Sequence, residues 1–271
     1  MTFSIVARSD DGESWGVAVA SKFLAVGSAV PAAVAGIGAI ATQAHANVAY
    51  KGQALAHLDD GATAEVALEA LLEDDDQRDH RQVGLVDSDG NAATHTGGQC
   101  FDWAGGVTGP GVAIQGNILA GPHVVEAMKD AWDNNADRPF ARRLLAALSA
   151  GDAVGGDKRG RQSAAIFVVR EEAGYDGGDD VAVDLRVDDH TNPCAELGRL
   201  LDLQELYLTR SAPEERVPID DELRSELETR AKALGHPDFD AWVGTENYEM
   251  RVGPDWVDEK VLAILREGAR A

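Results

Sequence analysis

Thr2 is the residue whose type and position most directly suggest chemistry in this chain. Its small side chain follows Met1, which is the arrangement that an aminopeptidase needs to remove an initiator methionine. Removal exposes an α-amine with a pKa of about 7.7–8.0 beside the hydroxyl-bearing carbon, so the amine can act as general base for its own side chain. The dipeptide predicts an N-terminal nucleophile, although Met-Thr also begins many proteins that do not use the threonine in chemistry.

Two amide side chains, Gln115 and Asn117, end a strand predicted over residues 112–117. Amide donors that point at developing negative charge usually give the largest electrostatic contribution to acyl transfer, and Gly116 between them allows close backbone approach. We therefore predict that Asn117 stabilises an oxyanion and that Gln115 contacts substrate. The alternative is a bulge that ends in a turn asparagine.

Residues 42–47 lead from a predicted strand into a predicted helix, and the N-terminus of a helix is a natural anion site. Gln43, His45 and Asn47 are therefore predicted to contact substrate. Taken alone, His45 also fits a hydrogen-bonded structural histidine.

Residues 155–163, GGDKRGRQS, concentrate three cations in an acidic chain. Their glycines permit positive φ and expose backbone N–H groups, while the lysine and arginines can hold a carboxylate or a phosphate. The predicted substrate-binding residues in this loop are Asp157, Lys158, Arg159, Gln162 and Ser163. A solvated basic hairpin that offsets neighbouring acidic residues is the alternative.

Asp188, Asp189 and His190 are consecutive residues of metal-ligating types. Neighbouring side chains of an extended segment point to opposite faces, so three in a row cannot all ligate one ion. We therefore predict neither a metal site nor a cofactor.

The charge of the chain excludes several classes of partner. It has 47 Asp and Glu against 24 Lys and Arg, and the formal net charge of −23 would repel phosphate backbones and anionic lipid. We expect a small-molecule substrate or ligand, with no nucleic acid and no membrane partner. Residues 1–20 lack the basic start and apolar run of a secretory signal, so we expect a cytoplasmic protein.

The acidic residues are 29 Asp and 18 Glu, beside 6 Lys. Such a surface suits high salt, because a Debye length of about 3 Å at molar ionic strength screens the self-repulsion. We predict a halophilic source, with an acidic mesophilic protein as the alternative. Cys100 and Cys194 match no metal spacing and are expected to be free, buried thiols.

The elements that must position these residues are hairpins with helix pairs between them. Strands are predicted over residues 2–8, 15–21, 28–35, 37–44, 81–87, 91–96, 112–117, 162–170 and 180–187. Helices are predicted over residues 47–58, 63–73, 122–135, 139–150 and 193–209. Hairpins make sheets antiparallel, and sheets buried on both faces need helices outside them, so the prediction is an α+β fold arranged as a four-layer α/β/β/α sandwich.

The composition changes after the last of these helices. Residues 209–218 hold prolines and glutamates with few apolar anchors, and are predicted to link a domain over 1–209 to a small helical module over 219–271. Helices are predicted in the module over 220–234 and 255–267. Sandwich folds with apolar helical layers often associate, so a homodimer is the expected oligomer.

Several stretches of the chain resemble the DUF1028 family. They are TFSIVARS (2–9), GVAVASKFLAVGSAVP (16–31), GAIATQAHAN (38–47), HRQVGLVD (80–87), QGNILAG (115–121), GGDKRGRQSAA (155–165) and DLRVDDH (184–190). The resemblance implies membership of the Ntn-hydrolase-like superfamily and its four-layer sandwich. Residues 227–236 and 242–251 resemble a small module named as peptidoglycan-binding that often follows DUF1028, for which we expect a packing or dimerisation role.

The resemblance carries the superfamily's chemistry directly to Thr2 alone. Relatives such as proteasome β subunits tune the nucleophile with an Asp just past the second strand and a Lys that begins a later strand, whereas the similar place here holds Ser21 and Lys22. A nearby cation depresses the pKa of an amine, so Lys22 is a candidate catalytic residue. Two functions stay open: an amidohydrolase that acts on a small amide through Thr2, and a non-catalytic ligand-binding or assembly protein on the same fold.

Overall fold

The computed structural model describes residues 2–268. Its contacts divide the chain into one unit that ends at Arg199 and a second that begins at Leu200. Helix α6 (Pro193–Leu208) carries the chain from the first unit into the second. The described residues form nine α-helices and antiparallel sheets, which confirms the predicted α+β class.

The first unit is built on a six-stranded antiparallel sheet in the order β10-β9-β2-β1-β8-β7. Its strands are β1 (Thr2–Arg8), β2 (Ser14–Ser21), β7 (Gly105–Gly109), β8 (Val112–Asn117), β9 (Ser163–Arg170) and β10 (Val181–Val187). Thr2 is paired with Asn117 of β8, and Phe3 with Ala20 of β2. The first strand of the chain is therefore an interior strand.

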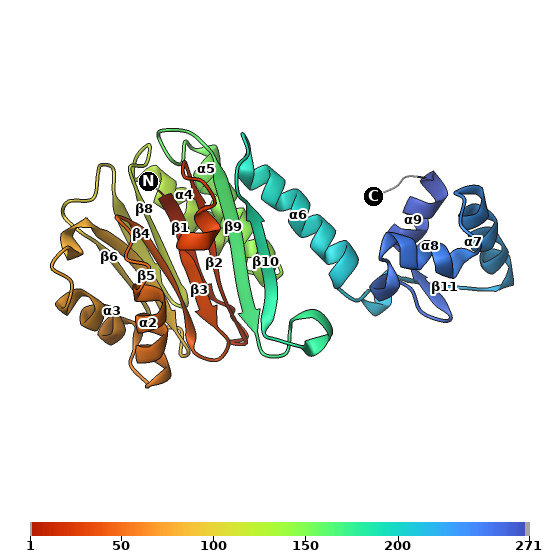
Figure 1. Ribbon diagram of the computed structural model, residues 1–271, viewed down its shortest axis with the longest axis horizontal. Coiled ribbons are helices and arrows are strands. Elements are labelled where there is room, and N and C mark those ends of the chain that lie inside the picture. Colours follow the sequence, from red (N-terminus) through yellow and green to blue (C-terminus); the bar gives the residue numbers. More distant parts are fainter. Residues whose placement is uncertain (1, 269–271) are drawn as a thin grey trace. The chain divides into compact units, whose positions relative to one another are not determined.

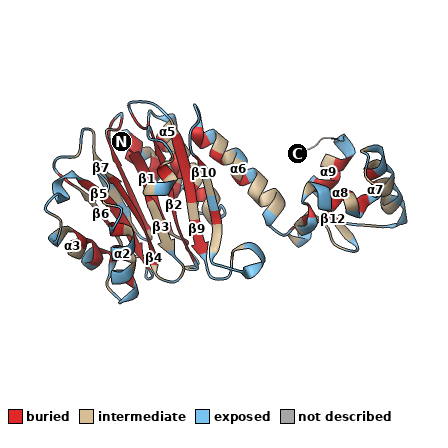
Figure 2. Ribbon diagram, viewed as in Figure 1, coloured by how far each residue is buried: buried red, intermediate tan, exposed pale blue. Residues whose placement is uncertain are grey.

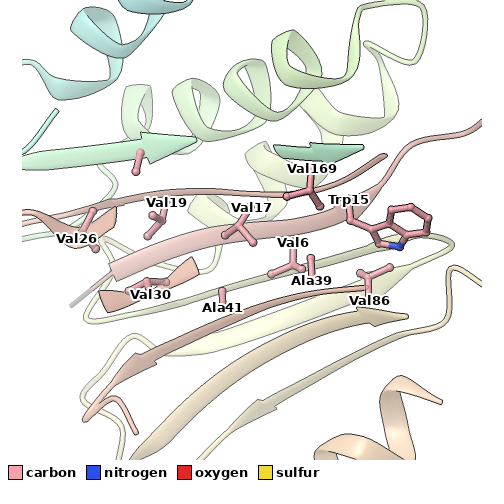
Figure 3. Close-up of a cluster of buried hydrophobic side chains, with 11 residues drawn as sticks. Val6, Trp15, Val17, Val19, Val26, Val30, Ala39, Ala41, Val86 and Val169 are labelled. Carbon is pink, nitrogen blue, oxygen red and sulfur yellow. The ribbon is translucent and has the colours of Figure 1, made fainter. Parts of the chain in front are cut away.

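A four-stranded antiparallel sheet packs face to face against the first sheet. Its strands, in order, are β3 (Pro31–Val34), β4 (Gly38–Ala44), β5 (Arg81–Asp87) and β6 (Ala92–Thr96). Alternate residues of a strand share a face, and small or β-branched side chains fill the space between the sheets. Figure 3 shows this apolar region, which contains Val6, Trp15, Val17, Val19, Ala39, Ala41 and Val86.

Helices cover the outer face of each sheet, so the layers follow in the order helix, sheet, sheet, helix (Figure 1). Helices α2 (Tyr50–Asp59) and α3 (Ala64–Glu73) pack on the four-stranded sheet, and α4 (His123–Asp133) and α5 (Phe140–Ala153) pack on the six-stranded sheet. Figure 2 shows buried strands inside and helices that each expose one face. No helix within residues 2–268 is both long and apolar enough to cross a lipid bilayer.

The second unit has a small hydrophobic core of its own. Strand β11 (Arg216–Pro218) pairs with β12 (Trp256–Asp258), and the helices are α7 (Asp221–Ala233), α8 (Phe239–Glu246) and α9 (Glu259–Glu267). Phe239, Trp242 and Tyr248 are buried and pack ring against ring. A buried ion pair joins Arg251 Nη1 to Asp258 Oδ2 at 2.9 Å.

Three predicted elements are wrong in part. The strand predicted over 28–35 is replaced by the short helix α1 (Val26–Ala29) and the four-residue β3, because Pro31 has no N–H to donate and starts an edge strand. The helix predicted from residue 255 begins at Glu259, because β12 pairs with β11 and the Asp258 side chain then caps the helix. The linker predicted over 209–218 contains buried Ser211 and β11.

Besides α1, β11 and β12, two further elements were missed, and one cap was predicted correctly. Strand β7 has the sequence GGVTG, which offers a single large apolar side chain as a signal, and α8 is only eight residues long. Thr63 caps α3 as expected, since its hydroxyl accepts a hydrogen bond from the Val66 N–H at 3.4 Å.

The cysteines differ from the expectation in one respect. Both are free, but Cys194 is buried whereas Cys100 is only half-buried. Among the described residues, no group of three or more His, Cys, Asp or Glu side chains could hold a metal ion.

Candidate active site at the start of strand β1

Thr2 lies at the end of the interior strand β1 with its hydroxyl beside that of Ser21, the last residue of β2. The two side-chain oxygens are 3.1 Å apart, and either can be the donor. Both residues are buried, with 5% and 2% of their surface exposed. The antiparallel register places them opposite each other, so the two hydroxyls meet at one edge of the inter-sheet space.

The carbonyl oxygen of Thr2 accepts hydrogen bonds from two amide side chains that come from different sheets. Gln43 Nε2, at the end of β4, lies 3.3 Å from it, and Asn117 Nδ2, at the end of β8, lies 3.5 Å from it. Both amide groups also donate to Gln82 Oε1 of β5, at 2.9 and 2.8 Å. Gln82 therefore holds the two donors in place, and they in turn hold Thr2.

Ser4 and Gln115 extend this network along the same strands. Gln115 Nε2 donates to Ser4 Oγ at 2.7 Å, and Ser4 Oγ donates to Gln43 Oε1 at 2.8 Å. We call Ser4, Gln43, Gln82, Gln115 and Asn117 the amide cluster; each of its members is at most 1% exposed. A buried network of this kind fixes one arrangement when its hydrogen bonds are made, and its members carry no charge.

The cluster also depends on a glycine and on further acceptors. Gln82 Nε2 donates to the Gly116 carbonyl at 2.7 Å and to Thr96 Oγ1 at 2.9 Å. A Cβ at Gly84 would overlap the side-chain amide of Gln115, so only glycine fits there. The missing side chain of Gly84 therefore leaves the space that the Gln115 amide occupies.

The chain turns sharply directly after two members of the cluster. Ala44, after Gln43, has φ +66°, and Ile118, after Asn117, has φ +52°. Non-glycine residues in this region cost about 1–3 kcal/mol each, and a β-branched residue such as Ile118 adopts it rarely. Strain of this kind gathers at functional sites, and here it marks the edge of the cluster.

The loop over residues 155–163 is attached to the neighbours of Thr2. The Asp157 carboxylate is buried and accepts hydrogen bonds from the backbone N–H of Lys22 at 2.7 Å and of Arg159 at 2.9 Å. The Gln162 N–H donates to the Ser21 carbonyl at 3.2 Å. Gly156 has φ +42°, and a Cβ there would lie 3.0 Å from the Phe3 ring, so the glycine lets the loop lie against β1.

A cavity of about 430 Å³ opens at this loop, lined in part by Asp152, Asp157, Lys158 and Arg161. The Arg161 Nε donates to both oxygens of Asp152, at 2.8 and 2.9 Å, and this contact raises the pKa of Arg161. Lys158 Nζ donates instead to the Asp102 carbonyl at 2.7 Å. Its charge is therefore not neutralised by a carboxylate within the described residues.

The segment after β4 is held by Arg81. Its guanidinium donates to the His45 carbonyl at 2.5 Å and to Asp75 Oδ2 at 2.8 Å. The hydrogen bond from Arg81 holds the pKa of Asp75 well below its usual range. Arg81 Nη1 also lies 3.2 Å from His45 Nδ1, and a guanidinium can only donate, so this ring nitrogen is the acceptor.

The family of the chain is shown by sequence comparison. Residues 2–197 match the model of DUF1028, a family of unknown function. The chain belongs to the DUF1028 family. The match ends before the second unit and does not identify the C-terminal module; no curated protein matches the chain.

Two solved structures are similar to this DUF1028 chain. Protein SPO2555 from Silicibacter pomeroyi, described as a DUF1028 protein, is 33% identical with a TM-score of 0.68, covering 75% of this chain and 89% of that one. Anbu (ancestral beta-subunit) from Yersinia bercovieri is 11% identical with a TM-score of 0.36, covering 78% of this chain and 98% of that one. The second likeness is too low to support a conclusion about the chain.

The structure brings some of the predicted site residues together and separates others. Thr2, Gln43, Gln115 and Asn117 share the amide cluster and its immediate contacts. Within residues 2–268, the hydrogen bonds of Lys22 go to the Asp157 carboxylate and, from Nζ, to the Arg161 carbonyl at 3.2 Å, and not to Thr2.

Other predicted residues form hydrogen bonds or ion pairs with partners outside the cluster. Asn47 Oδ1 accepts from the Ala49 N–H at 3.2 Å, which folds the segment that leads into α2. Ser163 Oγ accepts from the Val26 N–H at 3.0 Å, and Arg159 Nη2 lies 3.1 Å from Asp157 Oδ2.

Two members of the amide cluster were missed in the sequence. Ser4 and Gln82 are polar residues inside otherwise buried strands, TFSIVAR and RQVGLVD. A polar side chain at an inward-facing position of such a strand needs a buried partner, and that was the available signal.

Proposed function

We propose that this protein is an N-terminal-nucleophile amidohydrolase that acts on a small amide through Thr2. The proposal includes the Ntn-hydrolase-like sandwich as its fold, which the helix, sheet, sheet, helix order of the first unit supports. The observation that carries it is the placement of Thr2. Its hydroxyl meets Ser21 at 3.1 Å, and its carbonyl is held by Gln43 and Asn117 on an interior strand.

In the proposed reaction, removal of Met1 frees the α-amine of Thr2. The amine takes the hydroxyl proton as Thr2 Oγ1 attacks the amide carbon, so a C–O bond forms and an electron pair moves to the carbonyl oxygen. The intermediate collapses with cleavage of the C–N bond, and the proton passes to the leaving nitrogen, which departs as an amine. Water then hydrolyses the Thr2 ester, which releases a carboxylic acid and restores the threonine.

The amide cluster supports this reaction by orientation. A nucleophile held in one geometry loses less freedom on reaching the transition state, and two donors on the Thr2 carbonyl restrict its main chain. Asn117 is the proposed oxyanion donor. Its 3.5 Å contact to the Thr2 carbonyl is the weaker of its two hydrogen bonds and can be exchanged for the oxyanion, while Gln43 continues to hold that carbonyl.

The cavity beside the 155–163 loop supports an anionic end on the substrate. Lys158 lines it and has a charge that no described carboxylate neutralises, and Arg161 adds a guanidinium that is shared with Asp152. A carboxylate bound there would meet charge-assisted donors in a chain whose net charge otherwise repels it.

The test uses an electrophile rather than an unknown substrate. Intact mass first shows whether Met1 has been removed, and the protein is then treated with a β-lactone, whose strained ester acylates a reactive hydroxyl. We expect one adduct on Thr2, none in Thr2→Ala, and an undiminished adduct in Ser21→Ala. Full retention of Met1, or labelling that persists in Thr2→Ala, would exclude the reaction.

A non-catalytic ligand-binding or assembly protein is the second candidate. Lys22, the cation predicted to lower the pKa of the amine, hydrogen-bonds elsewhere, and the amide cluster is uncharged. This candidate expects no β-lactone adduct but binding of a small carboxylate that Lys158→Ala weakens. Its assembly form expects a homodimer, which light scattering of the full chain would show.

A further inference from the structure

Exposed apolar side chains gather on the loops around Thr2. Nine large apolar residues are exposed in the described part of the chain, and five of them lie on four loops at this end of the sheets. The five are Phe101 at 75% exposed, Leu24 at 60%, Val48 at 57%, Phe23 at 54% and Val154 at 42%. We call these five residues the apolar rim.

The two phenylalanines of the apolar rim are tied to the immediate neighbours of Thr2. Phe23 comes two residues after Ser21, and its carbonyl accepts a hydrogen bond from the Ser163 hydroxyl. The Phe101 carbonyl accepts from the Ile118 N–H at 2.9 Å, one residue beyond the Asn117 that pairs with Thr2. Both backbones are therefore fixed beside the site while the side chains remain exposed.

The two valines complete the rim on the other loops. Val48 follows Asn47, whose carbonyl accepts from Thr42 Oγ1 at 3.3 Å, next to Gln43 of the amide cluster. Val154 comes two residues before Gly156, which lies against the ring of Phe3.

The apolar rim stands beside two cations that carboxylates leave unpaired. Lys22 and Lys158 donate their amino groups to the carbonyls of Arg161 and Asp102, and neither forms an ion pair within the described residues. Large exposed apolar side chains that gather at one place on a soluble protein usually mark a binding site. A ligand that satisfies both features has an apolar part and an anionic part.

We propose that the substrate is an amide that joins an apolar group to an anionic one, as in an N-acyl amino acid. The apolar group would lie against Phe23, Leu24 and Phe101, and the carboxylate would bind near Lys158. That this amide is hydrolysed rests on the proposed function, whereas that it binds does not. The ligand is a small molecule, because the five residues come from four separate loops rather than from one helix or sheet face. Lys158, which donates to the carbonyl of Asp102 beside Phe101, also lines the polar cavity.

The experiment measures binding by calorimetry to the full-length Thr2→Ala protein, which cannot turn the ligand over. N-octanoylglycine is compared with N-acetylglycine, which keeps the amide and the carboxylate but lacks the apolar chain. We expect the octanoyl compound to bind at least about tenfold more tightly, since each buried methylene adds to the affinity. Lys158→Ala should weaken both compounds.

Substitutions in the rim show where the octanoyl group of the ligand binds. Phe101→Ala and Phe23→Ala should each weaken N-octanoylglycine by about tenfold and leave N-acetylglycine unchanged. Tyr175→Ala is the matched control, because Tyr175 is an aromatic residue 80% exposed outside the rim, and it should change neither affinity. Circular dichroism checks that each variant is folded.

Three results would overturn the proposal. The first is that the two compounds bind equally or not at all. The second is that the preference for the octanoyl compound survives both phenylalanine substitutions. The third is that Phe101→Ala has a lower molar mass in solution than the wild type, which would make the rim a contact between copies of the chain. If selectivity is found but wild-type protein, freed of Met1, does not hydrolyse N-octanoylglycine, the binding inference stands and the amidohydrolase function fails.

Discussion

The space between the two sheets contains two regions of opposite character on the same strands. On β1, Val6 packs into the apolar region with Ala39 and Val86, while Ser4, two residues earlier on the same face, hydrogen-bonds in the amide cluster. Apolar packing requires only the right volume, whereas a buried amide must find a partner for each donor and acceptor. The amide cluster therefore fixes the positions of the groups that contact Thr2, which the apolar region does not do.

Substitutions of similar size should therefore have different effects in the two regions. Removing an apolar group leaves a cavity whose cost depends on relaxation around it. Removing a shared acceptor leaves several donors without partners in a place that water does not reach. Orientation at Thr2 should suffer in the second case and not in the first.

The largest effect is expected for Gln82→Leu. This change removes the acceptor of Gln43 and Asn117 and the donor to Gly116, so the free energy of unfolding should fall by about 3 kcal/mol. Urea unfolding in molar KCl measures it, and β-lactone labelling of Thr2 should also slow. Gln53→Leu, on an exposed face of α2, is the control and should change stability little. A neutral result for Gln82→Leu would mean that the cluster is not fully hydrogen-bonded in solution.

Val17→Ala should have the next largest effect. Val17 is fully buried in the apolar region, and loss of two methyl groups with their cavity should lower the free energy of unfolding by about 2 kcal/mol. Labelling of Thr2 should proceed at the normal rate. The matched control is Val66→Ala on the exposed face of α3. If Val17→Ala slowed labelling as much as Gln82→Leu, the two regions would not be separable.

Lowering the pH should weaken the contact between Asp75 and Arg81 beside the amide cluster, but not the uncharged cluster itself. The Arg81 hydrogen bond lowers the folded-state pKa of Asp75, so its contribution is present above the unfolded pKa of about 3.9 and is lost as pH falls further. We expect Asp75→Asn to flatten the fall of the urea midpoint between about pH 4 and pH 2. An unchanged slope would show that the Asp75 to Arg81 contact does not contribute in solution.

The smallest effect is expected for Ser21→Ala. It removes one hydroxyl contact to Thr2 and should lower the free energy of unfolding by about 1 kcal/mol. Ser28→Ala, which removes an exposed hydroxyl in α1, is the control. If Ser21→Ala lowered the free energy of unfolding more than Val17→Ala does, Ser21 would belong to the structural network rather than lie at its edge.

Much of the fold could be predicted from the sequence because it depends on local patterns. Thr63 caps its helix by a local rule, and the hairpins follow from turn residues. The start of α9 could not be predicted, because the pairing of β12 with the distant β11 decides it. The segment before β3 could not be predicted either, because its apolar residues fit a strand as well as the short helix that ends before Pro31. Local apolar patterns favour both a strand over 28–35 and a helix from 255.

The sequence predicts individual residues of the candidate site, but not that they lie together. Thr2, Gln43 and Asn117 stood out as polar groups at strand ends, but their convergence depends on how two sheets face each other. Gln82 is the clearest case. It lies between buried neighbours in β5, and it becomes the shared acceptor because Gln43 is its partner on β4 and because β5 faces Asn117 of β8 in the other sheet. Ser4 was missed for the same reason.

The interior position of β1 means that this strand is completed late in synthesis. Thr2 is the first described residue, yet its partner Asn117 is made more than a hundred residues later, on the order of ten seconds at usual translation rates. Thr2 can be buried only after β8 has been made and has paired with β1. The proposed reaction requires removal of Met1, and during this interval the threonine that follows Met1 is not yet held in the sheet.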